Sequence, residues 1–476
     1  MTDNASCMRR ALVVVLLAQL ACTSSRVTVP AVSTAANPVT ATLAEADRQA
    51  SRGCYLCLQA AAGGYAEALS SMDDPALLKR ALENALMILL REAELRIPDS
   101  GAREEARSLQ ARVPESYALY FRTIDALERD QVAMRGEWRS LAMELEKQWP
   151  ASPMKAYFYV TAALSGGGAA DLKAQVSAIL DTHSTDLGLV YRMLAFPPTF
   201  SADAARQLVA DEAGFGEVPF VVGRQAVLDA RLDDAHRELT RARQILPDSS
   251  AINLLLGNVK LAYARYAEAL VLFEQVLRNG PDEAAGIGRA KALSYLGRHG
   301  EALVALSVLL ENVQNNPGEK YYWRAWNNLR LSRTQEAHED ALSALKAMRN
   351  NDVFRLAGIA SFGLGRLLEA RGQLESALEM KADDCDAQRV LAQLDATERR
   401  RAAASARFAS AVACYDRELT RMRHELARHE QDISGLSNGL IASLRHDIKV
   451  AEGLRATSAR NADLLASTTP NAESLR

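Results

Sequence analysis

An acidic residue followed by alanine occurs five times in the second half of the chain at nearly regular spacing. The five pairs are Asp234-Ala235, Glu268-Ala269, Glu301-Ala302, Glu336-Ala337 and Glu369-Ala370, separated by 34, 33, 35 and 33 residues. A period of this length indicates a stack of similar structural units. Two helices of about a dozen residues cannot bury their apolar faces alone, so each unit must pack against the next.

Residues around the dipeptide recur as well. Each of the first two units has a glycine twelve residues before its alanine, a large apolar residue four after it and a proline twelve after it: Gly223, Leu239 and Pro247, then Gly257, Phe273 and Pro281. These positions resemble the tetratricopeptide repeat (TPR) family, whose unit is a helix-turn-helix of 34 residues. The resemblance predicts a TPR array of about five repeats over residues 214–383.

The small residues have a physical role in such an array. Where two helices approach closely, a side chain larger than alanine would push the backbones apart and leave a void. We therefore assign the following residues to packing between helices: Gly223, Ala235, Gly257, Ala269, Ala302, Ala337, Gly358 and Ala370. The match is weaker in the third and fourth units, where Ala290 and Ala325 replace the glycine.

Length and composition bound the fold class and the range of partners. The chain has 476 residues, 24% of them charged, with a formal net charge of −3. It is too long for one ordinary core, and its near-neutral charge argues against a general nucleic-acid binder. Strand patterns are poor throughout. With the resemblance, this predicts an all-α protein, a right-handed α-solenoid of stacked antiparallel helix pairs with a C-terminal helical cap.

The N-terminus has the features of an export signal over residues 1–21. Arg9 and Arg10 precede a mostly apolar run that ends at Cys22, and this run is too short to span a bilayer. The residues before Cys22 resemble a lipobox, which would make Cys22 the lipidated first residue, although Gln19 departs from that pattern. A conventionally cleaved secretory signal is the alternative. Residues 22–43 are expected to form a flexible tether.

Four cysteines remain after the signal: Cys54, Cys57, Cys385 and Cys414. An even number in an exported protein suggests disulfides. Cys385 should begin a helix and Cys414 should lie near the far end of the next, so a bridge between them is geometrically reasonable. The Cys54–Cys57 pair has a CxxC spacing, for which a structural disulfide or buried thiols, pairing with another chain, and redox exchange or metal binding all remain open.

The regions that flank the array are also expected to be helical. Residues 44–213 contain helical segments with turns at proline and glycine, and we interpret them as degenerate helical repeats. Residues 384–476 are expected to form capping helices. Sparse apolar residues within 416–465 recur at helical spacing, so this segment either packs on the solenoid or forms a coiled coil with a partner, which would make oligomerisation an alternative function.

No catalytic or metal-binding pattern is present in the sequence. The seven histidines are scattered, and no pair has the spacing of a helical metal site. The glycine clusters lack the residues of a phosphate-binding loop. We therefore expect no enzymatic activity, no cofactor, no metal and no small-molecule substrate.

A binding function follows from the solenoid itself, because the first helix of each unit lines its concave surface. The TPR resemblance places nine residues in this groove: Phe220, Arg224, Asn258, Lys291, Tyr295, Tyr322, Trp326, Arg330 and Arg355. Aromatic and basic side chains together suit a peptide with apolar and acidic groups. The leading hypothesis is a scaffold of the bacterial envelope, lipid-anchored, facing the periplasm and favouring the outer membrane, that binds a partner protein. A thiol-disulfide protein using Cys54 and Cys57 is a weaker alternative.

Overall fold

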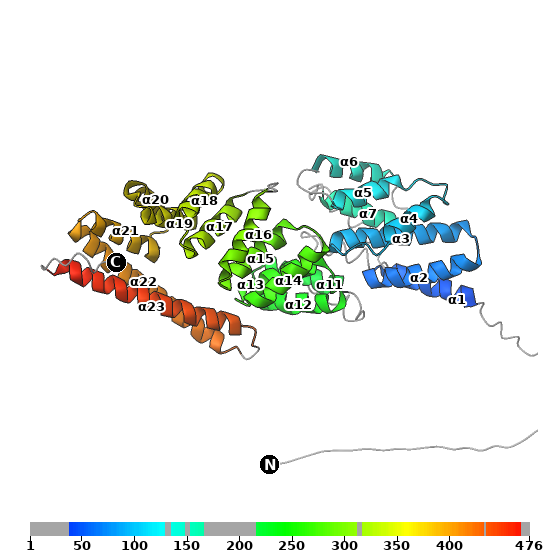
Figure 1. The fold of residues 1–476 in the computed structure, drawn as a ribbon. Coiled ribbons are helices and arrows are strands. Elements are labelled where there is room, and N and C mark those ends of the chain that lie inside the picture. The colour runs from blue at the N-terminus through cyan, green and yellow to red at the C-terminus, as the bar shows by residue number, and fades with distance from the viewer. Residues whose placement is uncertain are drawn as a thin grey trace, which may run out of the picture.

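The computed structural model describes residues 38–128, 135–147, 153–165, 216–311, 317–432 and 435–467. Within these ranges every regular element is an α-helix and none is a strand, which confirms the predicted all-helical solenoid (Figure 1). The predicted export signal, Cys22, most of the tether and the last part of the degenerate region lie outside the described residues. The tether was expected to extend to residue 43, but the first helix already begins at Pro38, whose fixed φ suits the first turn of a helix.

The N-terminal region is a group of helices that precedes the array (Figure 1). These are α1 (Pro38–Arg52), α2 (Tyr55–Ser71), α3 (Pro75–Leu95), α4 (Ala102–Gln110), α5 (Ala118–Glu128), α6 (Arg135–Glu146) and α7 (Pro153–Ser165). Asp74 caps α3 by accepting a hydrogen bond from the Ala76 amide, and Pro75 opens that helix. The central helix α3 packs against α2 on one side and against α4 and α5 on the other.

The array consists of consecutive antiparallel helix pairs. Its helices are α11 (Glu217–Leu228), α12 (Leu232–Ile245), α13 (Ser250–Ala262), α14 (Tyr266–Asn279), α15 (Glu283–Tyr295), α16 (His299–Glu311), α17 (Gly318–Arg330), α18 (Thr334–Ala347), α19 (Asn351–Gly363) and α20 (Leu367–Met380). Each helix packs on the next in sequence, which is the contact pattern of a solenoid. Pro247 and Pro281 follow directly after α12 and α14 have ended, because proline cannot donate the hydrogen bond that continues a helix.

The turn between the two helices of a unit explains the acid-alanine pair. An arginine precedes the second helix in every unit, and its guanidinium pairs with the acid three residues later, as in Arg231–Asp234 at 2.6 Å and Arg298–Glu301 at 2.6 Å. The acid also lies in the first turn, where the helix dipole favours negative charge. The alanine that follows is the fourth residue of the helix and faces the first helix of its unit.

All five of these alanines are fully buried. The glycines of the first helices make equally close contacts with the second helices. A Cβ atom added at Gly223 would lie 2.7 Å from Leu239, one at Gly257 would lie 2.7 Å from Phe273, and one at Gly358 would lie 2.6 Å from Leu374. Helices of one unit therefore approach to a distance that admits only glycine on one side or alanine on the other.

A sixth unit follows the five that the sequence predicted. Helix α21 (Cys385–Thr397) pairs with α22 (Arg401–Glu430), and Ala404, the fourth residue of α22, is fully buried like its counterparts. Ala403 stands where the other units carry the acid, so the dipeptide pattern does not reveal this unit. Helix α22 also extends well beyond the length of a repeat helix.

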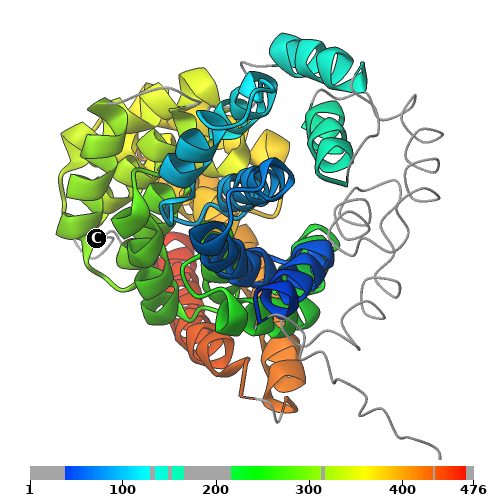
Figure 2. The same ribbon diagram turned by 90° about the vertical axis from the view of Figure 1, so that its right-hand side faces the viewer.

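The C-terminus forms a helical hairpin of α22 and α23 (Asn438–Ala466), and this hairpin runs back along the array toward its first units (Figures 1 and 2). The segment 416–465 is therefore two helices, with a turn near Gly435. Its apolar residues pack within the chain around Leu419, Met422, Leu444 and Ala451. The side chains proposed for a coiled coil with a partner are thus used in an intramolecular contact.

The N-terminal region joins the array through buried polar groups. The carboxylate of Glu217, at the start of α11, accepts a hydrogen bond of 2.6 Å from the Tyr55 amide. The Ser249 hydroxyl donates to the Leu95 carbonyl at 2.6 Å, and the Ser250 amide donates to the Arg96 carbonyl at 3.1 Å. These contacts fix α2 and α3 against the beginning of the array.

Candidate binding site

Five aromatic side chains from three consecutive units lie together, and we call them the aromatic patch: Tyr266, Tyr295, Tyr322, Trp323 and Trp326. Tyr266 is the first residue of α14 and Tyr295 is the last residue of α15, while the other three belong to α17. Positions three and four apart share one face of a helix, so α17 presents its three rings side by side.

The rings of the patch contact one another in sequence. Tyr266 and Tyr295 are stacked with centroids 4.6 Å apart, and the Tyr295 ring meets Trp323 edge-on at 5.5 Å. Trp323 in turn meets Trp326 at 5.8 Å and Tyr322 at 5.5 Å. Such pairs stabilise one another and hold the rings in place. The patch is therefore an ordered surface, and 50% of Tyr295 is accessible to solvent.

Cationic side chains border the patch. The guanidinium of Arg330 lies 4.8 Å from the centroid of the Trp326 ring, and Arg330 is exposed at the end of α17. Lys291 lies 5.9 Å from the Trp323 ring and forms an ion pair with Glu319. Among the described carboxylates none pairs with Arg330, so its positive charge can be offered to a ligand.

Burial and neighbouring groups alter the acidity of the patch. Burial raises the pKa of Tyr295 to about 12, and the nearby hydroxyls of Tyr266 and Tyr322 and the carboxylate of Asp447 add to this effect. Burial also raises the pKa of Tyr322. The tyrosines consequently remain neutral hydrogen-bond donors at physiological pH.

The structure brings together five of the nine residues that the sequence placed in the groove: Lys291, Tyr295, Tyr322, Trp326 and Arg330. Asn258 is exposed on α13.

Three of the nine have other roles. Phe220 is only 6% exposed, because it packs in the core between α11 and its neighbours, so its assignment to the groove was wrong. Arg224 lies 5.8 Å above the Phe220 ring. Arg355 donates hydrogen bonds to Asp384 at 3.0 Å and to Asp352 at 2.8 Å, and so connects the fifth unit to the sixth.

Two residues of the patch were missed by the sequence reasoning. Trp323 is next to a predicted position, but the repeat template does not assign it to the groove. Tyr266 belongs to a second helix, which the template places on the outer side. An aromatic residue at the first position of α14, directly after the turn, was the available signal, because a long side chain at that position can reach the end of the adjacent first helix.

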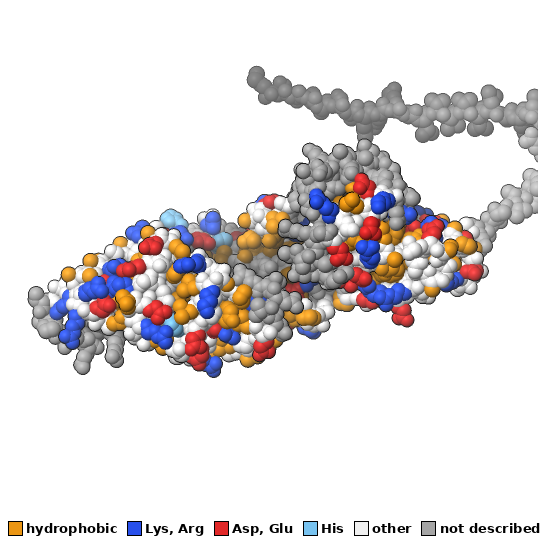
Figure 3. Space-filling model, turned by 90° about the horizontal axis from the view of Figure 1, so that it is seen from above, with side chains coloured by type: hydrophobic (Ala, Val, Ile, Leu, Met, Phe, Trp, Pro, Cys, Tyr) orange, Lys and Arg blue, Asp and Glu red, His pale blue; other side chains and the backbone are white. Residues whose placement is uncertain are grey.

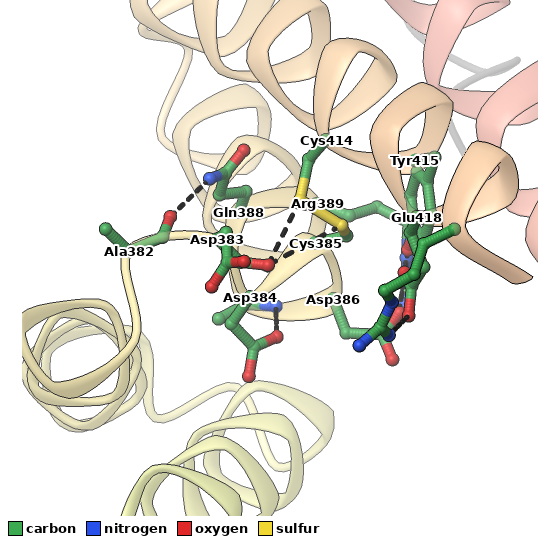
Figure 4. The surroundings of a disulfide bond; sticks show 12 residues. Ala382, Asp383, Asp384, Cys385, Asp386, Gln388, Arg389, Cys414, Tyr415 and Glu418 are labelled. Carbon is green, nitrogen blue, oxygen red and sulfur yellow. Dashed lines mark hydrogen bonds and ion pairs between the residues drawn. A yellow bond between two sulfur atoms is a disulfide. The ribbon is translucent and has the colours of Figure 1, made fainter.

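Both cysteine pairs are disulfides in the structure, with S–S distances of 2.07 Å for Cys54–Cys57 and 2.06 Å for Cys385–Cys414. The second bridge joins the start of α21 to α22 (Figure 4). Cys414 was expected near the end of its helix, but it lies near the middle because α22 continues to Glu430. Cys54 and Cys57 are both buried, which disfavours the thiol exchange that a redox protein requires.

A search of the described side chains finds no group of three or more His, Cys, Asp or Glu residues placed to hold a metal ion. Among the helices that the structure describes, none combines the length and the apolar character needed to cross a bilayer.

Comparison with known families agrees with this architecture. Residues 226–293 match the tetratricopeptide repeat family. The matched stretch runs from the end of α11 into α15, and therefore includes the first part of the aromatic patch. No curated protein matches the sequence.

Several solved structures share the fold with this chain. YrrB, described as a TPR protein with an unusual peptide-binding site, is 18% identical, with a TM-score of 0.34, over 39% of this chain and 97% of its own. PilF of Pseudomonas aeruginosa is 15% identical, with a TM-score of 0.37, over 42% of this chain and 90% of its own. The APC/C hetero-tetramer Cut9–Hcn1 is 13% identical, with a TM-score of 0.46, over 82% and 76%. At these identities the likeness concerns the fold alone.

Proposed function

We propose that this TPR-containing protein is a non-enzymatic scaffold that binds an extended peptide segment of a partner protein on its aromatic patch. The observation that carries the proposal is the continuous set of ring contacts from Tyr266 to Trp326 across three units. Aromatic side chains and arginine are the usual anchors of protein interfaces, since they bury a large area at low conformational cost. Here they are exposed on one surface of a monomeric chain and are already ordered.

The chemistry of the patch selects the ligand. Ring faces accept apolar and aromatic side chains, while Arg330, next to Trp326, favours a carboxylate at one end of the bound segment. The described part of the face in Figure 3 carries Lys and Arg interspersed with Asp and Glu, without a large area of one sign. Recognition therefore depends on the local pairing of an aromatic anchor with an acidic group.

This proposal is tested with labelled peptides in which Phe alternates with Glu, Phe with Lys, or Ala with Glu. We expect the Phe/Glu peptide to bind best. Trp326→Ala should weaken its binding by about 2 kcal/mol, which is roughly thirtyfold in Kd. Leu368→Ala is the matched control, because Leu368 is a large apolar residue that is 86% exposed on the second helix α20. Equal affinity of the two variants would rule out the patch as the binding surface.

We also propose that the scaffold operates in the cell envelope, with Cys22 as a lipidated residue. Two support this location: the signal-like N-terminus, and the two disulfides, which persist in oxidising compartments. Metabolic labelling with an alkyne fatty acid should mark the wild-type protein and not Cys22→Ala. Labelling of both proteins, or of neither, would contradict lipidation at this residue.

A further inference from the structure

The α22–α23 hairpin is fixed firmly at its base. The Cys385–Cys414 disulfide ties α22 to the start of α21, and the Tyr415 hydroxyl donates a hydrogen bond of 2.7 Å to Asp386 on α21 (Figure 4). Burial and the Asp386 carboxylate both raise the pKa of Tyr415, so this donor stays protonated. The base of the hairpin therefore moves together with the last unit of the array.

The tip of the hairpin meets the array at a second, distant place. A Cβ atom added at Gly439 would lie 2.6 Å from the carbonyl oxygen of Tyr263 and 3.0 Å from that of Ala264, in the turn between α13 and α14. Leu436 packs beside it against the core that contains Tyr263. The tip thus touches the backbone of the second unit, while the base is attached to the sixth.

The face that α23 turns toward the array is polar. Its apolar residues Leu440, Leu444 and Ile448 pack against α22. Ser443 hydrogen-bonds to the Tyr266 side chain, and the Asp447 carboxylate lies near Tyr266 and Tyr295. The core of the hairpin is therefore independent of the array, and a few tip residues and polar groups make the contact between them.

We propose that the hairpin is an intramolecular strap that covers the Tyr266–Tyr295 end of the aromatic patch and must release its tip to admit a partner. The inference rests on the proposed binding function. Asp447 places a carboxylate beside the aromatic rings, where the acidic group of a peptide would otherwise lie. The strap and the ligand consequently compete for one surface, and only the Trp326–Arg330 end stays open while the tip is docked.

The small tip contact makes release feasible without unfolding. The hairpin keeps its buried α22–α23 core and its disulfide when the tip leaves Tyr263, so only the few contacts of Leu436, Gly439 and Ser443 are lost. If the released form is the competent one, the apparent Kd equals the intrinsic Kd divided by the released fraction. Any change that loosens the tip should therefore tighten binding.

The test uses a matched pair of glycine substitutions in α23. Gly439→Ala places a methyl group against the Tyr263 backbone, whereas a Cβ at Gly453 meets nothing within 4 Å. Alanine is a better helix former than glycine, so neither change weakens α23 itself. Hydroxyl-radical footprinting reports the exposure of Tyr266, with the fully buried Trp138 as internal reference. The Phe/Glu peptide reports binding.

We expect Gly439→Ala to label Tyr266 several times faster than wild type and to bind the peptide about fivefold more tightly. Gly453→Ala should match wild type in both measurements. Unchanged labelling of Tyr266, or labelling that rises without tighter binding, would overturn the strap. Failure of the proposed function has a different signature, because Trp326→Ala would then leave binding unchanged in the Gly439→Ala background.

Discussion

The TPR array and the N-terminal helices are both entirely α-helical where the structure describes them, yet they are stabilised differently. In the array one contact recurs: a buried alanine at the fourth position of each second helix, from Ala235 to Ala404. In the N-terminal region no such contact recurs. Arg91 is fully buried there, and its guanidinium donates to the Gly53 carbonyl at 2.8 Å and to the Tyr157 hydroxyl.

This difference teaches where each region is vulnerable. The array spreads its stability over equivalent neighbours, so one damaged contact removes one interface of several. The N-terminal region concentrates polar groups around Arg91 and Glu217, where loss of one partner leaves another charge buried. Burial raises the pKa of Glu217, and the positive charge of Arg91 opposes that rise.

The largest effect is expected for Arg91→Met. This change removes the charge that stabilises the Glu217 carboxylate and should lower the free energy of unfolding by about 3–5 kcal/mol. The loss should shrink as the pH falls, because Glu217 can then be buried in its neutral form. Urea denaturation followed by circular dichroism measures the effect. Lys79→Met is the control, since Lys79 forms an exposed pair with Glu115 at 2.8 Å that should contribute under about 1 kcal/mol.

A smaller effect is expected for Gly358→Val within the array. The added side chain would collide with Leu374 in the second helix of the same unit, and overpacking of this kind costs about 1–3 kcal/mol. Gly372→Val is the control, because a Cβ at that position meets nothing within 4 Å. Thermal unfolding of the two variants separates the collision from the general effect of valine in a helix. Equal melting temperatures would refute the close approach of α19 and α20.

The smallest effect concerns His236 on α12 and is visible only in acid. Burial, aided by Lys260 and Arg265, lowers the pKa of His236 from 6.5 to about 4. Between these two values the unfolded chain binds a proton that the native protein does not, so stability rises with pH across this window and is constant above it.

His236→Gln should therefore flatten the pH dependence of unfolding between pH 4 and 6.5 while leaving the pH dependence above that window unchanged. The measurement is denaturation at a series of pH values. His446→Gln, at an exposed position of α23, provides the control. A steeper dependence in His236→Gln than in the control would show that this histidine is not held neutral by the array.

The array was predictable from sequence because its units repeat one physical requirement. Ala269, Gly257 and Pro281 obey that requirement visibly, and comparison between units reveals their role. The sixth unit was hidden because Ala403 replaces the acid. The interior position of Phe220 was also hidden, since a first-helix residue in the first unit packs toward the preceding helices instead of lining the groove.

The aromatic patch was only partly predictable, because it combines residues from both kinds of helix. Tyr322 and Trp326 follow the repeat template, but Tyr266 reaches the patch from the start of a second helix. The docking of the hairpin tip had no sequence signal at all. It is a contact between the backbones at Gly439 and Tyr263, residues that are far apart in the chain, and no side-chain pattern records it.

The most direct test of the binding surface is photo-crosslinking of a Phe/Glu peptide that carries a diazirine, with the attachment sites mapped by mass spectrometry. The aromatic patch predicts crosslinks to α17, to the end of α15 around Tyr295 and, when the tip is released in Gly439→Ala, to Tyr266 at the start of α14. Crosslinks confined to the second helices α16, α18 and α20, or unaffected by Trp326→Ala, would contradict the assignment of the binding surface to this patch.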